Sequence, residues 1–321
     1  MLHLRILLPA ELSAAVLALL GGYAGVGSVS IVRGAGVDPT GDLIDCEVVR
    51  EAVDELISEL GELGLDPAGA ISVSQVTLSL SAATDRALRE APGNSPDSVI
   101  WQQVEAHTAE DAAFSGTFLA FLTIATLLAG IGVIENSPIT VVGAMVVGPE
   151  FGPLAAISVG WVRRRRDLLR KGTVALTVGF PAAILLATGA AFLALRAGLF
   201  DAGTMSDNSQ VEFIYEPGAF SLIVALLAGA AGMLSTTSQK SAALVGVFIS
   251  VTTVPAAGFI AVGVVLGNWS QVGGSALQLV INLVGIVLAA VVTLLIVRQF
   301  DRYRAHRRSG TARSTTETPR P

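Results

Sequence analysis

Six apolar segments between residues 114 and 297 constrain this chain more than any other feature. They cover about 114–134, 138–161, 172–195, 218–236, 241–266 and 274–297, and each is near the ~20 residues that a helix needs to cross a bilayer. The whole chain is 52% hydrophobic and 14% charged, whereas a soluble domain carries about 25% charged residues. We therefore expect a multi-pass α-helical membrane protein with six transmembrane helices over residues 114–297.

The first third of the chain has a different composition. Residues 1–113 hold 17 of the 26 acidic residues and five of the 20 basic ones. Alternating apolar segments and two helical patterns predict the order βαββαβ over residues 1–81, which is that of a ferredoxin-like α+β domain. A signal peptide is the alternative for the first residues, but Pro9 and Glu11 cut its apolar run to about half a span.

Residues 82–113 read as a linker followed by a juxtamembrane helix. His107 stands beside Glu105, Glu110 and Asp111, which could form a metal site, but exposed charges on a helix at the membrane surface are the preferred interpretation. We expect no metal and no cofactor, because neither soluble segment has a phosphate loop or a nucleophile beside a base. Cys46 is the single cysteine and is interpreted as a small buried hydrophobe.

The basic residues predict the orientation in the membrane. Arg163, Arg164, Arg165 and Arg166 lie between the second and third apolar segments, Lys240 lies between the fourth and fifth, and the basic segment 298–321 follows the sixth. All of these fall on one side if both termini are cytoplasmic. We expect a prokaryotic plasma membrane protein whose four arginines are membrane-surface anchors at the anionic inner leaflet, with a disordered tail over 298–321.

The membrane segment contains two similar copies, at about 114–195 and 218–297. LLAG at 127–130 recurs at 226–229, and PLAAISVG at 153–160 resembles PAAGFIAVG at 255–263. Three spans per copy is an odd number, so the second copy enters the membrane from the opposite face, as in the inverted repeats of many secondary transporters. Chance matches between segments rich in small residues are the alternative.

Two breaks fall at matching places of these copies: GPEFGP at 148–153 in the second span and SVTTVPAAG at 250–258 in the fifth. Proline frees backbone carbonyls that bare lipid cannot satisfy, and Glu150 lies near the midplane, where an acid is by default a functional hypothesis. The candidate substrate- or ion-binding residues are Gly148, Pro149, Glu150, Gly152, Pro153, Thr252, Thr253, Pro255 and Asn282, with Ser250 and Gln278 as further polar partners for Glu150. A kinked packing helix with one satisfied acid is the alternative.

The stretch NSPITVVGAMVVGPEFGPLAAISVG resembles the signature of the DUF389 family of bacterial and archaeal membrane proteins. The matching residues are Ser137, Gly143, Ala144, Met145, Pro149, Gly152 and Pro153, and the resemblance extends over about residues 1–300. It implies an architecture but no activity, since the family has no established biochemical function. Members often have an apolar residue where this chain has Glu150. The broken backbone is therefore a better candidate than the acid for a functional feature shared by the family.

Three classes of function remain. The leading one is a transporter or channel-like protein for a small solute or ion, with its site at the broken second and fifth spans. The alternative is a non-transporting signalling or scaffold protein whose acidic domain binds a ligand or partner. An enzyme comes third, because residues 114–297 hold no histidine and the apolar segments hold no paired carboxylates. We expect a homo-oligomer, a dimer or trimer, in the lipid bilayer, without nucleic acid.

Overall fold

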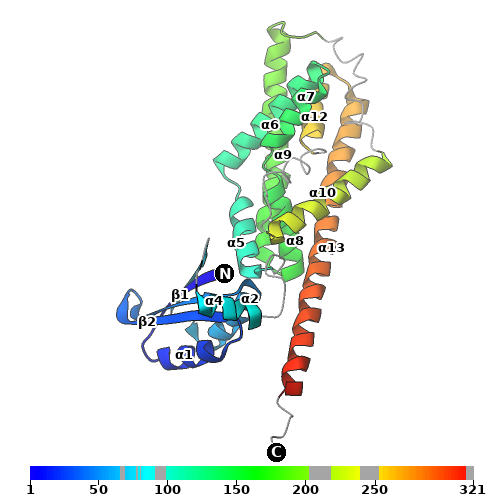
Figure 1. The fold of residues 1–321 in the computed structure, drawn as a ribbon. Coiled ribbons are helices and arrows are strands. Elements are labelled where there is room, and N and C mark those ends of the chain that lie inside the picture. Colours follow the sequence, from blue (N-terminus) through cyan, green and yellow to red (C-terminus); the bar gives the residue numbers. More distant parts are fainter. Residues whose placement is uncertain are drawn as a thin grey trace, which may run out of the picture. The chain divides into compact units, whose positions relative to one another are not determined.

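The computed structural model describes residues 1–65, 69–76, 79, 81–90, 99–201, 218–238 and 253–315, without the side chains of 90 and 301–315. The chain divides into two compact units, Met1–Gln103 with Asp301–Pro321, and Val104–Phe300 (Figure 1). Each unit is described by itself.

The first unit contains a four-stranded sheet with helices, which confirms the predicted α+β class. Its elements are β1 (Leu2–Leu8), α1 (Ser13–Gly22), β2 (Val26–Val37), β3 (Thr40–Val48), α2 (Arg50–Glu62) and β4 (Ala70–Gln75). The strand order is β2-β3-β1-β4 and all neighbouring strands are antiparallel. The order of strands and helices is therefore the predicted βαββαβ, although β4 ends earlier than the alternation suggested.

The core of this unit follows from the apolar spacing. Leu4 and Ile6 of β1 are buried, and α2 turns Val53, Leu56 and Leu60 into the same cluster. Cys46 lies in this core, where burial raises the pKa of its thiol to about 12. This agrees with the interpretation of Cys46 as a buried hydrophobe.

Helix α4 (Ala82–Glu90) was not predicted, because its nine residues were assigned to the linker. It packs against β2, and the Thr84 hydroxyl donates to Glu47 Oε2 of β3 at 2.7 Å. The Ser79 hydroxyl donates to the same oxygen at 2.9 Å. These contacts are non-local, so the short helical pattern alone gave little indication of them.

The second unit is helical. Its elements are α5 (Trp101–Asp111, which starts in the first unit), α6 (Gly116–Ile134), α7 (Pro138–Val147), α8 (Phe151–Arg163), α9 (Arg166–Arg196), α10 (Ala219–Ser238), α12 (Val254–Leu266) and α13 (Trp269–Thr315). Helix α5 agrees with the predicted juxtamembrane helix. Helix α13 continues to Thr315, into the segment expected to be a disordered tail.

Four of these helices are long and apolar enough to cross a membrane: α6, α9, α10 and residues Trp269–Phe300 of α13. A fifth candidate span is the pair α7 and α8, bent by 54° between its parts. The described residues thus support a multi-pass membrane protein with four to five candidate spans. The fifth predicted span, 241–266, is described only from residue 253 onward. There it forms the 13-residue α12.

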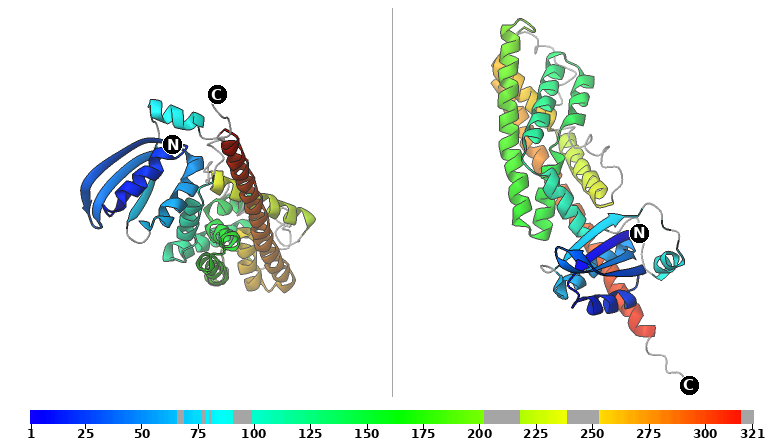
Figure 2. Two further views of the ribbon diagram at one scale, coloured as in Figure 1. Left: turned by 90° about the horizontal axis from the view of Figure 1, so that it is seen from below. Right: turned by 90° about the vertical axis from the view of Figure 1, so that its left-hand side faces the viewer.

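Helices α9 and α13 run in opposite directions along the second unit, as both Figure 1 and Figure 2 show. Helix α8 ends at the short turn into α9, and α12 ends at the short turn into α13. Because the starts of α9 and α13 lie at opposite ends of the helix bundle, α8 and α12 point away from each other. Their N-termini lie toward the middle of the bundle.

Candidate functional site

The predicted interruption at GPEFGP is present in the structure. Helix α7 ends at Val147, Gly148 is extended with ψ 127°, and α8 begins at Phe151 with Glu150 as its N-cap residue. The extended backbone of Gly148 is what a following proline requires, since the ring of Pro149 disfavours a helical conformation at the preceding residue. This explains why one apolar segment forms two helices.

The break in the fifth predicted span is described only from Thr253 onward. Thr253 is the N-cap residue of α12, and Pro255 lies in the first turn of that helix, where its missing N–H leaves no hydrogen bond unmade. Pro255 therefore starts a helix here. Ser250 and Thr252 lie outside the described residues.

The two N-cap residues meet each other. The Thr253 hydroxyl donates to Glu150 Oε1 at 2.7 Å, and the two side chains are 0% and 1% exposed. The first amides of a helix lack internal partners and carry a partial positive charge. The carboxyl group thus lies where the N-termini of α8 and α12 converge.

The hydrogen bond joins Glu150 and Thr253, which are 103 residues apart in the chain. Helices α8 and α12 also begin 103 residues apart, and both are 13 residues long. Each is followed by a residue in the left-handed conformation, Arg164 (φ 58°) after α8 and Gly267 (φ 75°) after α12. The next amide bonds back into the helix at 2.9 Å in each copy, from Arg165 to Gly160 and from Asn268 to Gly263. The following helices begin at Arg166 and Trp269, again at the same offset.

Glycines allow close packing around both half-helices. A Cβ on Gly152 would lie 2.6 Å from the Asp111 Cβ atom of α5, and a Cβ on Gly258 would lie 2.6 Å from that of Ala129 in α6. A Cβ on Gly172 of α9 would collide with the carbonyl oxygen of Pro153. Larger residues are excluded at these positions, so the half-helices are held tightly.

Asn282 and Gln278 lie on α13 and meet a residue of α10 that the sequence did not single out. The Ser221 hydroxyl donates to Asn282 Oδ1 at 3.3 Å, and Gln278 Nε2 donates to the Ser221 Oγ atom. Ser221 stands in an apolar run, and its only signal in the sequence was its polarity. The structure brings Glu150 together with Thr253, and Asn282 together with Ser221.

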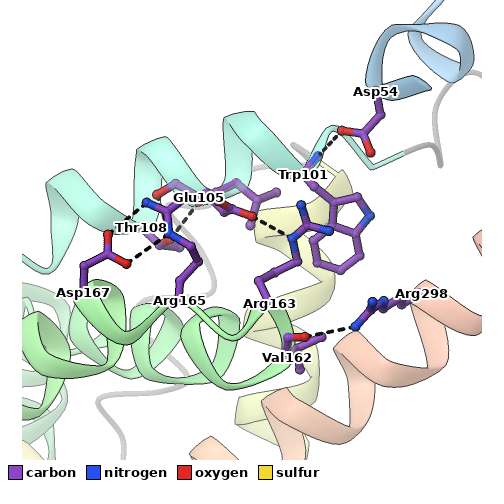
Figure 3. Close-up of polar contacts among 10 residues, drawn as sticks. Asp54, Trp101, Glu105, Thr108, Val162, Arg163, Arg165, Asp167 and Arg298 are labelled. Carbon is purple, nitrogen blue, oxygen red and sulfur yellow. Dashed lines mark hydrogen bonds and ion pairs between the residues drawn. The ribbon is translucent and has the colours of Figure 1, made fainter. Parts of the chain in front are cut away.

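A second polar network lies at the turn between α8 and α9 (Figure 3). Glu105 of α5 accepts from Arg163 Nε and from Arg165 Nη1, each at 2.7 Å. Arg165 also pairs with Asp167 at 2.9 Å, and Arg298 Nη1 donates to the Val162 carbonyl at 3.0 Å. Two of the four predicted membrane-surface arginines thus bind a carboxylate, while Arg164 and Arg166 are exposed.

Helix α5 therefore holds α8 at both ends. Its Asp111 packs on Gly152 at the start of α8, and its Glu105, 13% exposed, binds Arg163 at the end. Burial raises the pKa of the Asp111 carboxyl group. The 58 residues between Glu105 and Arg163 explain why local patterns did not indicate this contact.

Two cavities lie beside these helices. One, of about 330 Å³, is lined mainly by apolar residues of α6, α9 and α12, with Glu135 among its lining residues. The other, about 510 Å³ and more open, lies between α9, α12 and α13. Neither is lined by Glu150, Thr253 or Pro255, so the pair is closed off from both.

Comparison with known proteins places part of the chain in a family. Residues 145–288 match the family described as "Domain of unknown function (DUF389)", which agrees with the resemblance seen in the sequence. A similar protein is "Uncharacterized protein MJ0678" of Methanocaldococcus jannaschii, 25% identical over 197 residues, or 61% of this chain. The matched part spans 59% of that protein's length. No solved structure matches the chain.

Proposed function

We propose that this chain, whose residues 145–288 form a DUF389 domain, is a membrane transporter or channel-like protein for a small solute or ion. The observation that carries the proposal is the buried hydrogen bond between Glu150 and Thr253, at which two half-helices converge. In many secondary transporters, half-helices at corresponding positions of inverted repeats end at the substrate site near the midplane.

The proposal includes an inverted repeat of residues 114–195 and 218–297, with three spans in each copy. Its support is the constant offset of 103 residues between α8 and α12 and the opposite directions of α9 and α13 (Figure 1). The basic loops favour cytoplasmic termini in the plasma membrane of a prokaryote. The strand order β2-β3-β1-β4 favours a ferredoxin-like class for the cytoplasmic domain.

The closed Glu150–Thr253 pair corresponds to an occluded state in this scheme. Access from one side requires α8 to move relative to α12, which breaks the hydrogen bond between their N-cap residues. Since Glu105 and Asp111 of α5 hold α8 at its two ends, α5 controls this movement. In a proton-coupled version, Glu150 is the group that gains and loses the proton.

The close packing around the pair favours a second candidate. Gly152 and Gly258 leave no room for a side chain, and neither cavity reaches Glu150. A non-transporting signalling or scaffold protein, assembled as a dimer or trimer, would have such a closely packed centre. Its acidic N-terminal domain would bind the ligand or partner.

Flux in liposomes separates the two candidates. Vesicles with the purified protein and internal dyes sensitive to pH, Na⁺ and K⁺ are challenged with imposed gradients of these ions. We expect protein-dependent flux that falls at least about tenfold in Glu150→Gln, the size of effect that a buried charged hydrogen bond supports. Unchanged flux in Glu150→Gln removes the coupling role, and no flux under any gradient favours the scaffold. Ser158→Ala, a buried hydroxyl that bonds within its own helix, is the matched control.

A further inference from the structure

Four polar side chains form a cluster between α10 and α13, which we call the α10–α13 cluster: Ser221, Ser275, Gln278 and Asn282. The three residues on α13 follow helical spacing and thus share one face. They are 0%, 3% and 0% exposed in chain order. Ser221 bridges Gln278 and Asn282 across the two helices.

Two atoms of this cluster have no hydrogen-bond partner, Ser275 Oγ and Gln278 Oε1. The Ser221 hydroxyl has one proton, which it donates to Asn282, so it accepts from the Gln278 amide nitrogen and leaves the amide oxygen unused. Three other buried hydroxyls of this unit are satisfied within their own helix: Thr126, Ser158 and Thr237 donate to the carbonyl oxygen one turn back. Ser275 does not do so.

The fold does not require polar residues at these positions. At the offset of 103 residues, the equivalents of Ser221, Ser275, Gln278 and Asn282 are Phe118, Gly172, Ala175 and Gly179. A Cβ on Gly179 would lie 2.9 Å from Phe118, so α6 and α9 make the same contact with apolar groups. Because an unsatisfied polar group inside a membrane costs free energy, the second copy carries a cost that the first avoids.

We propose that the α10–α13 cluster is a binding site for a monovalent cation, whether an alkali ion or an ammonium-type ion. The unused Gln278 amide oxygen can only accept, so it attracts a cation, and the Ser275 hydroxyl can turn its oxygen lone pairs toward the same ion. Among the described residues of the second unit, the buried polar side chains are hydroxyls, amides and the carboxyl group of Glu150, without a lysine, arginine or histidine.

A divalent ion fits this cluster poorly, because sites for such ions are usually built with carboxylates. No group of three or more His, Cys, Asp or Glu side chains that could hold a metal occurs among the residues that the structure describes. Neutral amide and hydroxyl oxygens suit a singly charged ion, which has less charge to balance. The cation site goes beyond the proposed transport role, since binding requires no translocation.

Thermal unfolding of the full-length protein in detergent tests the site without any flux. The melting temperature is measured in NaCl, KCl, NH4Cl and choline chloride at equal ionic strength. We expect at least one small cation to raise it, because a ligand that binds only the folded state stabilises that state. Choline, a much larger cation, serves as the reference salt and should give no such rise. The comparison of NaCl and KCl with NH4Cl identifies which type of ion binds.

Gln278→Leu gives the sharpest variant, because its two effects have opposite signs. In choline chloride its melting temperature should equal or exceed that of the parent, since an unused buried oxygen is removed. The half-saturating cation concentration should rise by about tenfold or more, as expected for the loss of one hydrogen-bonding group to a charge. Ser275→Ala should weaken cation binding in the same direction, and Ser158→Ala should leave it unchanged.

Equal melting temperatures of the parent in all four salts would overturn the site. So would an unchanged cation response in Gln278→Leu and Ser275→Ala. A lower melting temperature of Gln278→Leu in choline chloride, with the cation response retained, would show that Gln278 acts only in packing. Cation binding without flux in liposomes would contradict the transport function and support the cation site. Flux without stabilisation by any cation would support the transport function and contradict the cation site.

Discussion

The two proposed copies have a similar local backbone at α8 and α12 and differ in chemistry. Helices α8 and α12 have equal length and matching turns, yet the N-cap residue is an acid in one and a threonine in the other. The first copy is held by α5 through Glu105, whereas the second has the α10–α13 cluster. The difference teaches that the helix–turn–helix geometry needs small residues and a left-handed turn, while its polar groups are free to serve a function in each copy.

The largest expected effect comes from filling a close contact in the second copy. Gly258 corresponds to Ala155 in the first copy, so Ala is compatible with the helix itself. A Cβ on Gly258 would nevertheless lie 2.7 Å from the Gly130 amide nitrogen. Gly258→Ala should lower the free energy of unfolding by about 1–3 kcal/mol, as overpacking does, in thermal unfolding in detergent.

Gly189→Ala is the control for this prediction, because a Cβ at Gly189 has no atom within 4 Å. It should be neutral or slightly stabilising, since alanine is the better helix former. Equal stability of the Gly258 and Gly189 variants would show that α6 and α12 are not in close contact.

Exchange of the two cap residues tests the equivalence of the copies. Glu150→Thr or Thr253→Glu alone should each destabilise by about 1–3 kcal/mol, because each leaves a buried polar group without its partner or places two acids together. The double variant restores one acid and one hydroxyl and should recover most of the loss. The coupling energy from a double-mutant cycle measures this, and additive losses would contradict the equivalence.

A smaller loss of stability is expected when the contact between α5 and α8 is weakened. Glu105→Gln removes the charge that binds Arg163 and Arg165, at a cost of about 1 kcal/mol or less, since both arginines are partly exposed. Hydrogen exchange should rise in α8 and not in α12, and the difference should shrink at high salt. Glu110→Gln on the same helix is the control, and equal exchange changes in the two variants would argue against the hold on α8.

The smallest effect is expected for the pH dependence of the first unit, which, like the second with Glu150, has a buried carboxylate. Asp42 accepts from the Ser13 hydroxyl at 2.7 Å and the Gly34 amide at 2.8 Å, and the Ser13 bond is the main cause that lowers its pKa below 3.8. A carboxyl group whose pKa is lowered by folding stabilises the folded state. This stabilisation is fully present above the pKa of the unfolded state, and it is lost as the pH falls through the pKa of the folded state.

Hydrogen exchange of β3 in the full chain should therefore be constant from pH 7 to about pH 4, after correction for intrinsic rates, and rise below it. Asp42→Asn should remove this dependence, and Asp45→Asn, on the same strand, should keep it. A pH dependence that persists in Asp42→Asn would assign it to another group.

Local patterns predicted much of the fold. The alternation of apolar and polar residues predicted the strands of the sheet, and the prolines and glycines of GPEFGP predicted the break between α7 and α8. The contacts of the site were harder to predict, because they join distant segments. Thr253 was one of several polar candidates for Glu150, and only the three-dimensional structure selected it. Ser221 and Glu105 depend on partners more than 50 residues away, which no local period reveals.

The inverted relation of the two copies is tested most directly by cysteine labelling in sealed vesicles. Asp167 and Ser270 are exposed residues at equivalent positions of the first turns of α9 and α13. In a Cys46→Ala background, which removes the only cysteine, a membrane-impermeant maleimide should label Asp167→Cys from the cytoplasmic side alone. It should label Ser270→Cys from the opposite side alone. Labelling of both cysteines from the same side would contradict an inverted repeat.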